Sequence, residues 1–508
     1  MGVSGASGSP PGRWRIHARE LPEPTRREIV RRAVAVVVVL VRRLAPTLVL
    51  ASARAGRARR DPLAYARAVR LAAQDLGGTF VKFGQLVASS PGLFGPELAE
   101  EFRACLDTGP AVPLDRVREV IESNLSMTLE RAFSSFEDVP IGRASIAVVH
   151  RARLSDGRDV AVKVLRPGVA RSVSVDLAVM VPLFALLTRV TGAQLAGGAV
   201  QLLDGLRLQV GEELDLRNEA RALTRFGALL DEAGFAALVV PEPVPERSGP
   251  DVLTMSLLDG AAIDDLAGAA RLGVDPAPLV DQLIRSFFTL VVREGVFHGD
   301  VHAGNLLLLR DGRLGIIDWG IVGRLDDRTH AFLLRILDAI LGDESAWRDV
   351  TAYFVESYGP QLRDAMGMDD EQLSVFMRSM LEPVLLRPFG EFSLGEMLLS
   401  VQARAAEAYG IELRTGGFFA ALRRLRVERR LHRAAMAGGG LSSEFDRQNF
   451  LLGKQLLYFE RYGKLFLADA PILTDRAFVE GLLAAARRDE GPSAPGTVAS
   501  IDELDQEG

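Results

Sequence analysis

Lysine is scarce in this 508-residue chain, where nearly all of the 60 basic residues are arginine. The four lysines are Lys82, Lys163, Lys454 and Lys464. The compact ammonium of lysine can act where the planar guanidinium of arginine cannot, so lysine is expected mainly where such a charge is required. Lys82 and Lys163 both fall inside motifs that point to chemistry.

Cysteine is also scarce. The chain has neither an excess of basic charge nor an apolar run long enough to span a bilayer. The single cysteine, Cys105, rules out an internal disulfide and fits a reducing, cytoplasmic compartment. The net charge of −6 argues against a nucleic-acid partner, which would need a basic surface. Two apolar runs, 33–41 and 44–53, are separated by arginines, and neither approaches the ~20 residues that span a bilayer.

The arginine-flanked apolar segment 25–60 has two interpretations. It is either a helix packed on the protein or a basic amphipathic helix that lies on an anionic membrane surface. In the second case the protein would be peripheral to the membrane. Residues 1–24 ahead of it are rich in Gly, Ser, Pro and Arg, and are predicted to be disordered without forming a signal peptide.

Two β-hairpins are predicted within an otherwise largely helical chain. Residues 146–154 and 158–165 flank an Asp-Gly turn, and 305–317 turns at a second Asp-Gly pair. This layout predicts an α+β, two-lobed protein-kinase-like fold with an N-terminal helical extension and extra C-terminal helices. The expected parts are a disordered N-terminus (1–24), the basic, apolar helical segment (25–60), a helical extension (61–135), an N-lobe with a helical insertion (136–260), a C-lobe core (261–345), a helical region (346–488) and a disordered acidic tail (489–508).

Lys163 ends the sequence Val-Ala-Val-Lys on the second strand of the first hairpin. Protein kinases place the lysine that contacts the ATP phosphates on such a strand, which fixes its height over the nucleotide. The structural alternative is a lysine that protects an edge strand from aggregation. Glu219, in a helix further along the chain, is the predicted ion-pair partner that would aim Lys163.

Residues 298–305 read His-Gly-Asp-Val-His-Ala-Gly-Asn, with the spacing of a kinase catalytic loop. Asp300 is predicted to accept or orient the attacking hydroxyl, and Asn305 to hold Mg²⁺. Asp318 opens an Asp-Trp-Gly triplet after the second hairpin and is predicted to chelate the Mg²⁺ that bridges the terminal phosphates of ATP. The loop histidines are interpreted as structural support, because its glycines disfavour a helix that would present both to a metal.

The phosphate-cradling Gly-x-Gly-x-x-Gly of kinases is missing before Lys163. Gly142, Ala144 and Ser145 stand in its place, and such small residues still let backbone amides approach a phosphate. Because the glycine pattern differs, a different loop geometry is expected around the phosphates. At the predicted hinge, Met255 and Leu257 are expected to contact the adenine of ATP through backbone groups.

A further motif precedes the kinase-like segment: residues 76–85 carry Lys-x-Gly-Gln, with Lys82, Gly84 and Gln85. With the other motifs, from about residue 73 to about 325, it resembles the UbiB/AarF (ABC1-type) atypical kinases that are linked to isoprenoid quinone metabolism. The resemblance implies that Glu213 and Asp215, the family's Glu-x-Asp motif, meet Lys82. It also implies that the helix carrying the Lys-x-Gly-Gln motif, the signature helix, covers the place where a protein substrate would dock.

The resemblance implies a Mg²⁺-dependent ATPase or kinase that acts on a lipid, a small molecule, water or itself. Two alternatives remain open: a small-molecule phosphotransferase resembling aminoglycoside and choline kinases, and a nucleotide-gated, non-catalytic scaffold. The catalytic loop and the Asp-Trp-Gly triplet occur equally in the small-molecule kinases. The Lys-x-Gly-Gln and Glu-x-Asp motifs favour the UbiB-like function, so these two motifs decide between the enzymes.

Overall fold

The computed structural model describes most of the chain. The described residues are 16–53, 62–88, 96–102, 104, 109, 111–191, 194–358, 368–386, 388, 443–468 and 475–489. Cys105, residues 1–15 and all but the first residue of the predicted acidic tail lie outside them. The chain divides into two compact units, the first comprising 1–279, 298–323 and 411–458, and the second 280–297, 324–410 and 459–508.

A five-stranded antiparallel sheet carries the first predicted hairpin. Its strands are β1 (Ser135–Phe136), β2 (Gly142–Arg143), β3 (Ala147–Arg153), β4 (Asp159–Leu165) and β6 (Val252–Ser256). They run in the order β1-β3-β4-β6, with β2 also paired to β3. The β3–β4 turn contains Gly157 at φ +89°, a left-handed conformation that suits glycine. The predicted hairpin is thereby confirmed.

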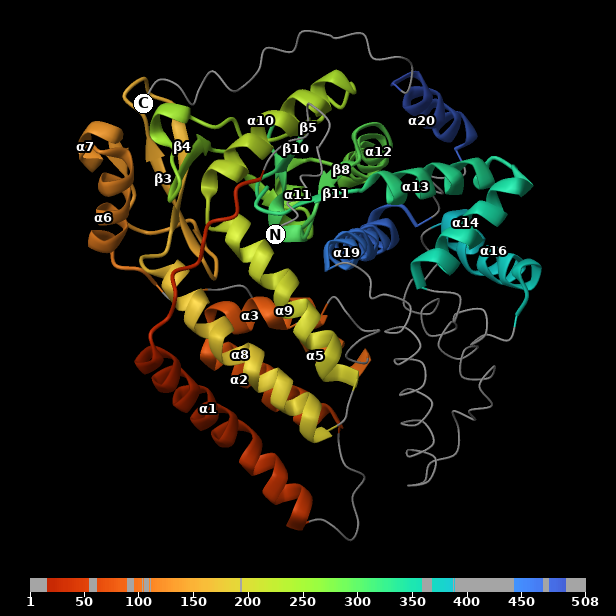
Figure 1. Cartoon of the computed structure of the whole chain (residues 1–508). Coiled ribbons are helices and arrows are strands. Elements are labelled where there is room, and N and C mark those ends of the chain that lie inside the picture. Colours follow the sequence, from red (N-terminus) through yellow and green to blue (C-terminus); the bar gives the residue numbers. More distant parts are fainter. Residues whose placement is uncertain are drawn as a thin grey trace, which may run out of the picture. The chain divides into compact units, whose positions relative to one another are not determined.

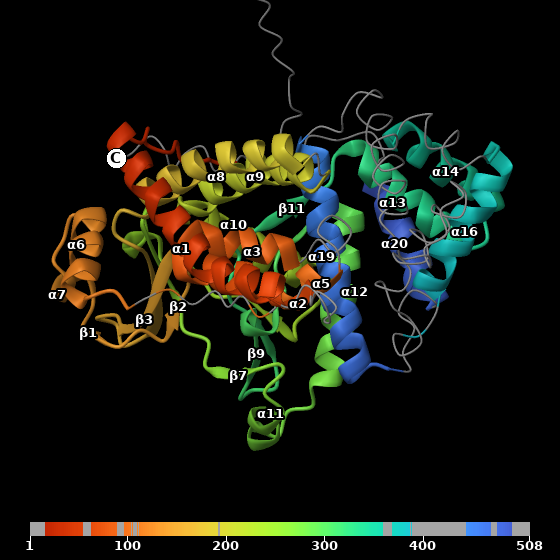
Figure 2. The same ribbon diagram turned by 90° about the horizontal axis from the view of Figure 1, so that it is seen from below.

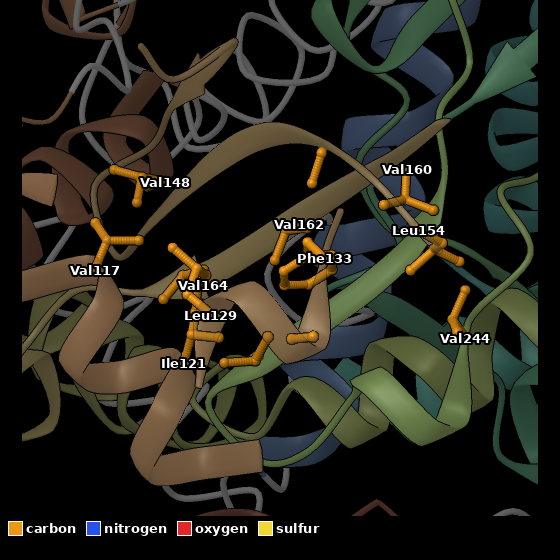
Figure 3. Packing of buried hydrophobic residues seen from close by; sticks show 13 residues of the cluster. Val117, Ile121, Leu129, Phe133, Val148, Leu154, Val160, Val162, Val164 and Val244 are labelled. Atoms are coloured by element: carbon orange, nitrogen blue, oxygen red, sulfur yellow. The ribbon is translucent and has the colours of Figure 1, made fainter. Parts of the chain in front are cut away.

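One face of this sheet is buried under two short helices, α6 (Leu114–Leu125) and α7 (Leu129–Ala132). Figure 3 shows Val162 and Val164 of β4 directed toward a cluster to which α6 contributes Ile121. Side chains alternate between the two faces of a strand. Since the even-numbered valines of β4 enter this cluster, the odd-numbered Lys163 points to the opposite face.

The second predicted hairpin belongs to a four-stranded sheet. Its strands are β5 (Leu238–Val239), β7 (Gly260–Ala262), β9 (Leu306–Leu309) and β10 (Leu314–Ile316), in the order β5-β10-β9-β7. β9 and β10 are antiparallel, with Leu306 opposite Ile316. Residues just before β9 and just after β10 therefore emerge at the same end of the hairpin, which brings the Asn305 and Asp318 segments together.

The remaining helices of the first unit include α1 (Arg26–Ala53), α2 (Pro62–Leu76), α3 (Gly78–Ala88), α5 (Pro96–Phe102), α8 (Val169–Thr191), α9 (Gln194–Glu213), α10 (Leu216–Glu232) and α11 (Leu266–Leu272). α1 packs against α2 and α8, and α3 packs against α2, α5 and α8 (Figure 1 and Figure 2). Among the described residues, we find no helix with the length and apolar composition needed to cross a bilayer.

The segment just before α1 differs from the predicted disorder. Residues 16–24 form neither helix nor strand, and their backbone is held at the α9–α10 junction. The Arg19 amide donates to the Gly211 carbonyl at 2.8 Å, and Asn218 exchanges two hydrogen bonds with the backbone of His17. Partners elsewhere in the fold therefore order a stretch that its composition alone predicts to be loose.

The second unit is mainly helical where it is described. It contains most of α12 (Pro276–Glu294) and all of α13 (Asp327–Ile340), α14 (Glu344–Tyr358), α16 (Asp370–Leu386) and α20 (Arg476–Asp489). α12, α13 and α20 share an apolar cluster that includes Val292, Leu337 and Val479. The other elements are η1 (Pro245–Arg247), β8 (Val296–His298), η2 (Ala303–Asn305), β11 (Val322–Arg324) and α19 (Ser443–Phe466).

Candidate active site

A buried ion pair joins Lys163 of β4 to Glu219 of α10. The Lys163 ammonium lies 2.8 and 2.7 Å from the two carboxylate oxygens of Glu219, whose side chain is only 2% exposed. Glu219 lies in the first turn of α10, where the helix dipole favours a negative charge. The structure thus brings together the two residues that the sequence predicts as partners.

Asp318 completes this cluster from the end of the second hairpin. Its Oδ1 lies 3.2 Å from the Lys163 ammonium and accepts the Gly320 amide at 3.0 Å, while its side chain stays 41% exposed. Desolvation favours the neutral form of Asp318, yet the ammonium of Lys163 holds the pKa of this carboxyl well below its usual range. Asp318 is therefore an ionised, accessible carboxylate.

The charges of the cluster favour a cation. Burial acts to lower the pKa of Lys163, but the carboxylates of Asp318 and Glu219 outweigh this effect and raise it. Burial raises the pKa of Glu219 to about 7, against the opposing attraction of Lys163. Above a pH of about 7, where Glu219 is ionised together with Lys163 and Asp318, the cluster carries one more negative than positive charge.

The catalytic-loop residues are tied to the Asp-Trp-Gly turn through His298. Its Nδ1 accepts the Asp300 amide at 2.8 Å, and its Nε2 lies 2.5 Å from the Asp318 carbonyl. Burial lowers the pKa of His298 to about 4, so the ring is neutral at pH 7 and carries its proton on Nε2. This geometry supports the predicted structural role of the histidine.

Asn305 and Asp300 form the other half of the loop. The Asn305 side-chain nitrogen donates to the Asp300 carbonyl at 2.9 Å, so the Asn305 amide oxygen points away from that carbonyl. His302 Nδ1 accepts the Gly304 amide at 3.0 Å and so shapes the short turn before Asn305. The loop thereby presents Asp300 and Asn305 on a backbone that is anchored to the Asp318 turn.

Trp319 occupies the middle position of the Asp-Trp-Gly triplet and is buried. Its ring centroid lies 4.1 Å from that of Phe226 in α10 and 4.4 Å from that of His298. Its indole nitrogen donates to the Ile316 carbonyl at 2.9 Å, which satisfies the one polar group of a side chain that is 3% exposed. The tryptophan therefore packs the triplet against both the helix that carries Glu219 and the catalytic loop.

The predicted phosphate loop is a tight connection between β2 and β3. Gly142, Val149, Lys163 and Leu253 form one row across the sheet, so Gly142 shares the face of Lys163. The amide of Ala144 donates to the Ala147 carbonyl at 2.9 Å and is thus used within the hairpin.

Arg166 fixes this same turn, because its Nε donates to the Ala144 carbonyl at 2.9 Å. The next residue, Ser145, is buried. At the hinge, Met255 pairs with Ala161 and shares the Lys163 face, and the Leu257 amide donates to the Asp159 carbonyl at 3.2 Å. Of the predicted nucleotide-binding positions, Gly142 and Met255 thus lie on the same sheet face as Lys163.

Lys82 of α3 lies 2.5 Å from Oε2 of Glu213, with both side chains at most 10% exposed. Gly84 and Gln85 follow on the same helix, where Gly84 is buried. A side chain added at Gly320 would come within 3.9 Å of both Glu213 and Glu219, so the Lys82 pair adjoins the Asp318 turn. Half of the expected Glu-x-Asp contact is therefore present.

Asp215 has a different role from Glu213, because it caps a helix. Its carboxylate caps the start of α10 by accepting the Arg217 amide at 3.1 Å, and it also pairs with the Arg217 guanidinium at 2.7 Å. Capping satisfies an amide that has no partner within the helix. Asp215 thus holds the helix that carries Glu219, and the described contacts of its carboxylate are with Arg217.

A family model and several relatives match the chain. The model of the ABC1 atypical kinase-like domain covers residues 105–349. Rv0647c of Mycobacterium tuberculosis is 32% identical over 79% of this chain and 74% of its own, and the chloroplastic aarF domain-containing protein kinase At5g05200 of Arabidopsis thaliana is 31% identical over 79% and 72%. The chain belongs to the ABC1 atypical kinase-like family. The predicted resemblance and the kinase-like fold class are confirmed.

A relative named as a UbiB kinase matches over less of its length. A probable protein kinase UbiB of Xylella fastidiosa is 32% identical over 66% of this chain and 60% of its own. Among solved structures, that of Rv3197 with erythromycin, from Mycobacterium tuberculosis, is 24% identical over 80% of this chain and 93% of its own, with a TM-score of 0.45.

One contact of this ABC1-family chain at the catalytic loop was not predicted from its sequence. The ammonium of Lys454, in α19, lies 2.6 Å from Oδ1 of Asp300. The scarcity of lysine is the signal that could have drawn attention to it, since Lys454 is one of only four lysines. No motif around Lys454 marks it.

Proposed function

We propose that this member of the ABC1 family is a Mg²⁺-dependent kinase or ATPase that acts on ATP. The observation that carries the proposal is the cluster of Lys163, Glu219 and Asp318, with 2.7 Å and 3.2 Å between the ammonium and the two carboxylates. Kinases require this pairing of the strand lysine with a helix glutamate, next to a metal-binding aspartate. We further propose that the activity supports isoprenoid quinone or lipid metabolism at a membrane surface.

The donor atoms fit magnesium. Asp318 offers an exposed carboxylate and Asn305 an amide oxygen, and Mg²⁺ prefers such oxygen ligands together with phosphate oxygens. The excess negative charge around Lys163 would be compensated by a divalent cation. When bound, the ion would neutralise charge that develops on the terminal phosphates.

The chain's own residues have separate tasks in this proposal. Lys163, aimed by Glu219, binds the phosphates of ATP, and the carboxylate of Asp300 accepts a hydrogen bond from the attacking hydroxyl or water. A bond forms from that oxygen to the terminal phosphorus while the bond to the ADP oxygen breaks. The proton of the attacking group passes to Asp300, and His298 keeps Asp300 in register with Asp318.

Asp318→Asn is expected to lower Mg²⁺-dependent ATP turnover by at least about 100-fold, because the metal loses its charged ligand and with it several kcal/mol of charge stabilisation. Release of phosphate from ATP by the purified chain, across a titration of Mg²⁺, measures this directly. Asp311→Asn, a change at a half-exposed carboxylate in the turn of the same hairpin, is the matched control and should leave turnover unchanged. Equal turnover in the wild type and Asp318→Asn would contradict the proposal.

The proposed membrane contact rests on α1. Five of its valines are 56–62% exposed and recur at helical spacing along one face: Val30, Val34, Val37, Val38 and Val41. Exposed arginines stand before, within and after this stripe, at Arg26, Arg27, Arg31 and Arg42. An apolar stripe bordered by cations suits an anionic lipid surface. The part of α1 that packs on α2 and α8 remains available to hold the helix on the protein.

Val34→Glu combined with Val38→Glu is expected to abolish flotation with vesicles of anionic phospholipid, because two carboxylates would enter the lipid boundary. Neutral vesicles should bind the wild type less than anionic ones do. Val139→Glu, which adds one charge at a valine that is 69% exposed outside α1, should float as the wild type does. A wild-type chain that floats with neither vesicle would remove the membrane contact but not the ATP-dependent activity.

The pair of Lys82 and Glu213 favours this function over a small-molecule phosphotransferase. Both enzyme classes share the catalytic loop and the Asp-Trp-Gly triplet, whereas the signature lysine is expected only in UbiB-like chains. In this chain the pair is nearly buried and adjoins the Asp318 turn. A protein acceptor is therefore a weaker candidate than a lipid, a small molecule, water or the chain itself.

A further inference from the structure

Two consecutive residues of α19 contact the catalytic loop. Lys454 places its ammonium 2.6 Å from Oδ1 of Asp300, and the side-chain Oε1 of Gln455 accepts the Val301 amide at 3.2 Å. The Gln455 side chain is fully buried, and the Lys454 side chain is only 15% exposed. α19 therefore contacts the loop through an ion pair and through a hydrogen bond from a loop amide to a glutamine side chain.

The residue type is informative at this position. An arginine would form a bidentate, planar pair with a carboxylate and would use both of its oxygens. The lysine ammonium is a compact charge, and here it contacts Oδ1 while the Asp300 side chain stays 24% exposed. Such a contact fixes one carboxylate oxygen and leaves the other able to accept a hydrogen bond from an incoming hydroxyl.

The electrostatics agree with the geometry. Desolvation acts to raise the pKa of Asp300, but Lys454 and then His302 lower it, so the carboxylate stays ionised. His298, which is neutral at pH 7, supports Asp300 through the backbone amide only. Lys454 thus places a cation 2.6 Å from the group that must receive the acceptor hydroxyl.

We propose that Lys454 is a positioning residue for phosphoryl transfer: it holds Oδ1 of Asp300 so that Oδ2 faces the attacking oxygen. This inference rests on the proposed function and adds a residue of α19 to its site. Lys454 acts through Asp300, whereas ATP binding depends on Lys163, which lies on β4. Loss of Lys454 should therefore slow the transfer without weakening the binding of ATP.

The test is a double-mutant cycle on the full chain. Lys454→Met is expected to lower kcat by about 10- to 100-fold, with KM for ATP unchanged within about twofold. Lys454→Arg should recover part of the loss, because it keeps a cation beside Asp300. In the Asp300→Asn background, Lys454→Met should cause no further loss, since the group through which it acts is already gone. Radiolabelled ATP makes the slow residual rates measurable.

Lys464→Met is the matched control: it removes a lysine from the same helix, where it pairs with Glu460 four residues earlier. It should leave kcat unchanged, and thermal unfolding should be similar for both lysine variants. Faster turnover in Lys454→Met would identify an inhibitory contact and overturn the proposal. A raised KM, or an equal fold-loss in the wild-type and Asp300→Asn backgrounds, would also overturn it. Wild-type turnover no greater than that of Asp318→Asn would instead overturn the proposed function itself, and this inference with it.

Discussion

Lys163→Met is expected to lower ATP turnover by at least about 100-fold and the free energy of unfolding by about 3–5 kcal/mol. The first effect follows because the phosphates and Asp318 lose their nearest ammonium. The second follows because Glu219, at 2% exposure, would keep its burial and lose its counter-charge. Phosphate release and urea denaturation, followed by tryptophan fluorescence, measure the two effects separately.

The double variant Lys163→Met/Glu219→Met separates folding from function. Replacing both members of a buried ion pair with apolar side chains is often neutral or stabilising, so the double variant should regain most of the lost stability. Turnover should stay as low as in Lys163→Met, because the phosphates still lack their ammonium. A double variant that recovers turnover would show that Lys163 acts through folding alone.

Arg158→Met provides the matched control on the same hairpin. Arg158 pairs with Asp156 at the β3–β4 turn, where the two side chains are 63% and 49% exposed. Exposed ion pairs contribute about 0–1 kcal/mol, because water screens the charges. This variant should therefore unfold and turn over ATP almost as the wild type does.

The parts of the site that lie on local structure could be predicted from the sequence. Asn305 and Asp318 bracket a short hairpin, and the pairing of Leu306 with Ile316 forces the two ends together whatever surrounds them. The direction of the Lys163 side chain could also be predicted, because side chains alternate along β4 and its valines are buried on the opposite face. In each case the decisive geometry is set within about twenty residues of chain.

Contacts between segments far apart in the chain were predicted only where a kinase or family pattern marks both partners, as for Lys163 with Glu219. Lys454 meets Asp300 only because α19 docks on the catalytic loop, and helical periodicity does not specify where a helix docks. Residues 16–24 are a second case. They bond to carbonyls at the end of α9, including that of Gly211, which lack partners within the helix. The amino-acid composition of a segment does not predict hydrogen-bond partners that lie elsewhere in the chain.

Asp215 shows how local chemistry can override a motif. The resemblance implied that Asp215 would meet Lys82 together with Glu213, but its carboxylate caps α10. An aspartate immediately before an amphipathic helix is a common N-cap. The same residue still serves the site indirectly, since α10 carries Glu219 four positions later. The motif therefore combines one contact to Lys82 with one that starts the helix of the site.

Lys82→Met is expected to speed amide hydrogen exchange in α3 by at least about 100-fold. The pair of Lys82 with Glu213 is at most 10% exposed, and removing one member of a buried pair costs about 3–5 kcal/mol. Mass spectrometry of exchanged peptides resolves α3 from β3 and β4, whose exchange should be unchanged. Arg43→Met is the control, because Arg43 and Asp75 join α1 to α2 through an ion pair that is about one-third exposed.

The same variant should weaken ATP binding by about tenfold. Glu213 adjoins the turn of Asp318, so without the Lys82 ammonium its negative charge would repel the phosphates. Lys82→Met/Glu213→Met removes that charge and should restore both the protection of α3 and the affinity for ATP. If α3 regains protection while the affinity stays low, Lys82 contributes to the nucleotide site by another route. Recovery of both would make the signature helix and the nucleotide site one electrostatic unit, in which Glu213 is tolerated beside the phosphates only while Lys82 is docked.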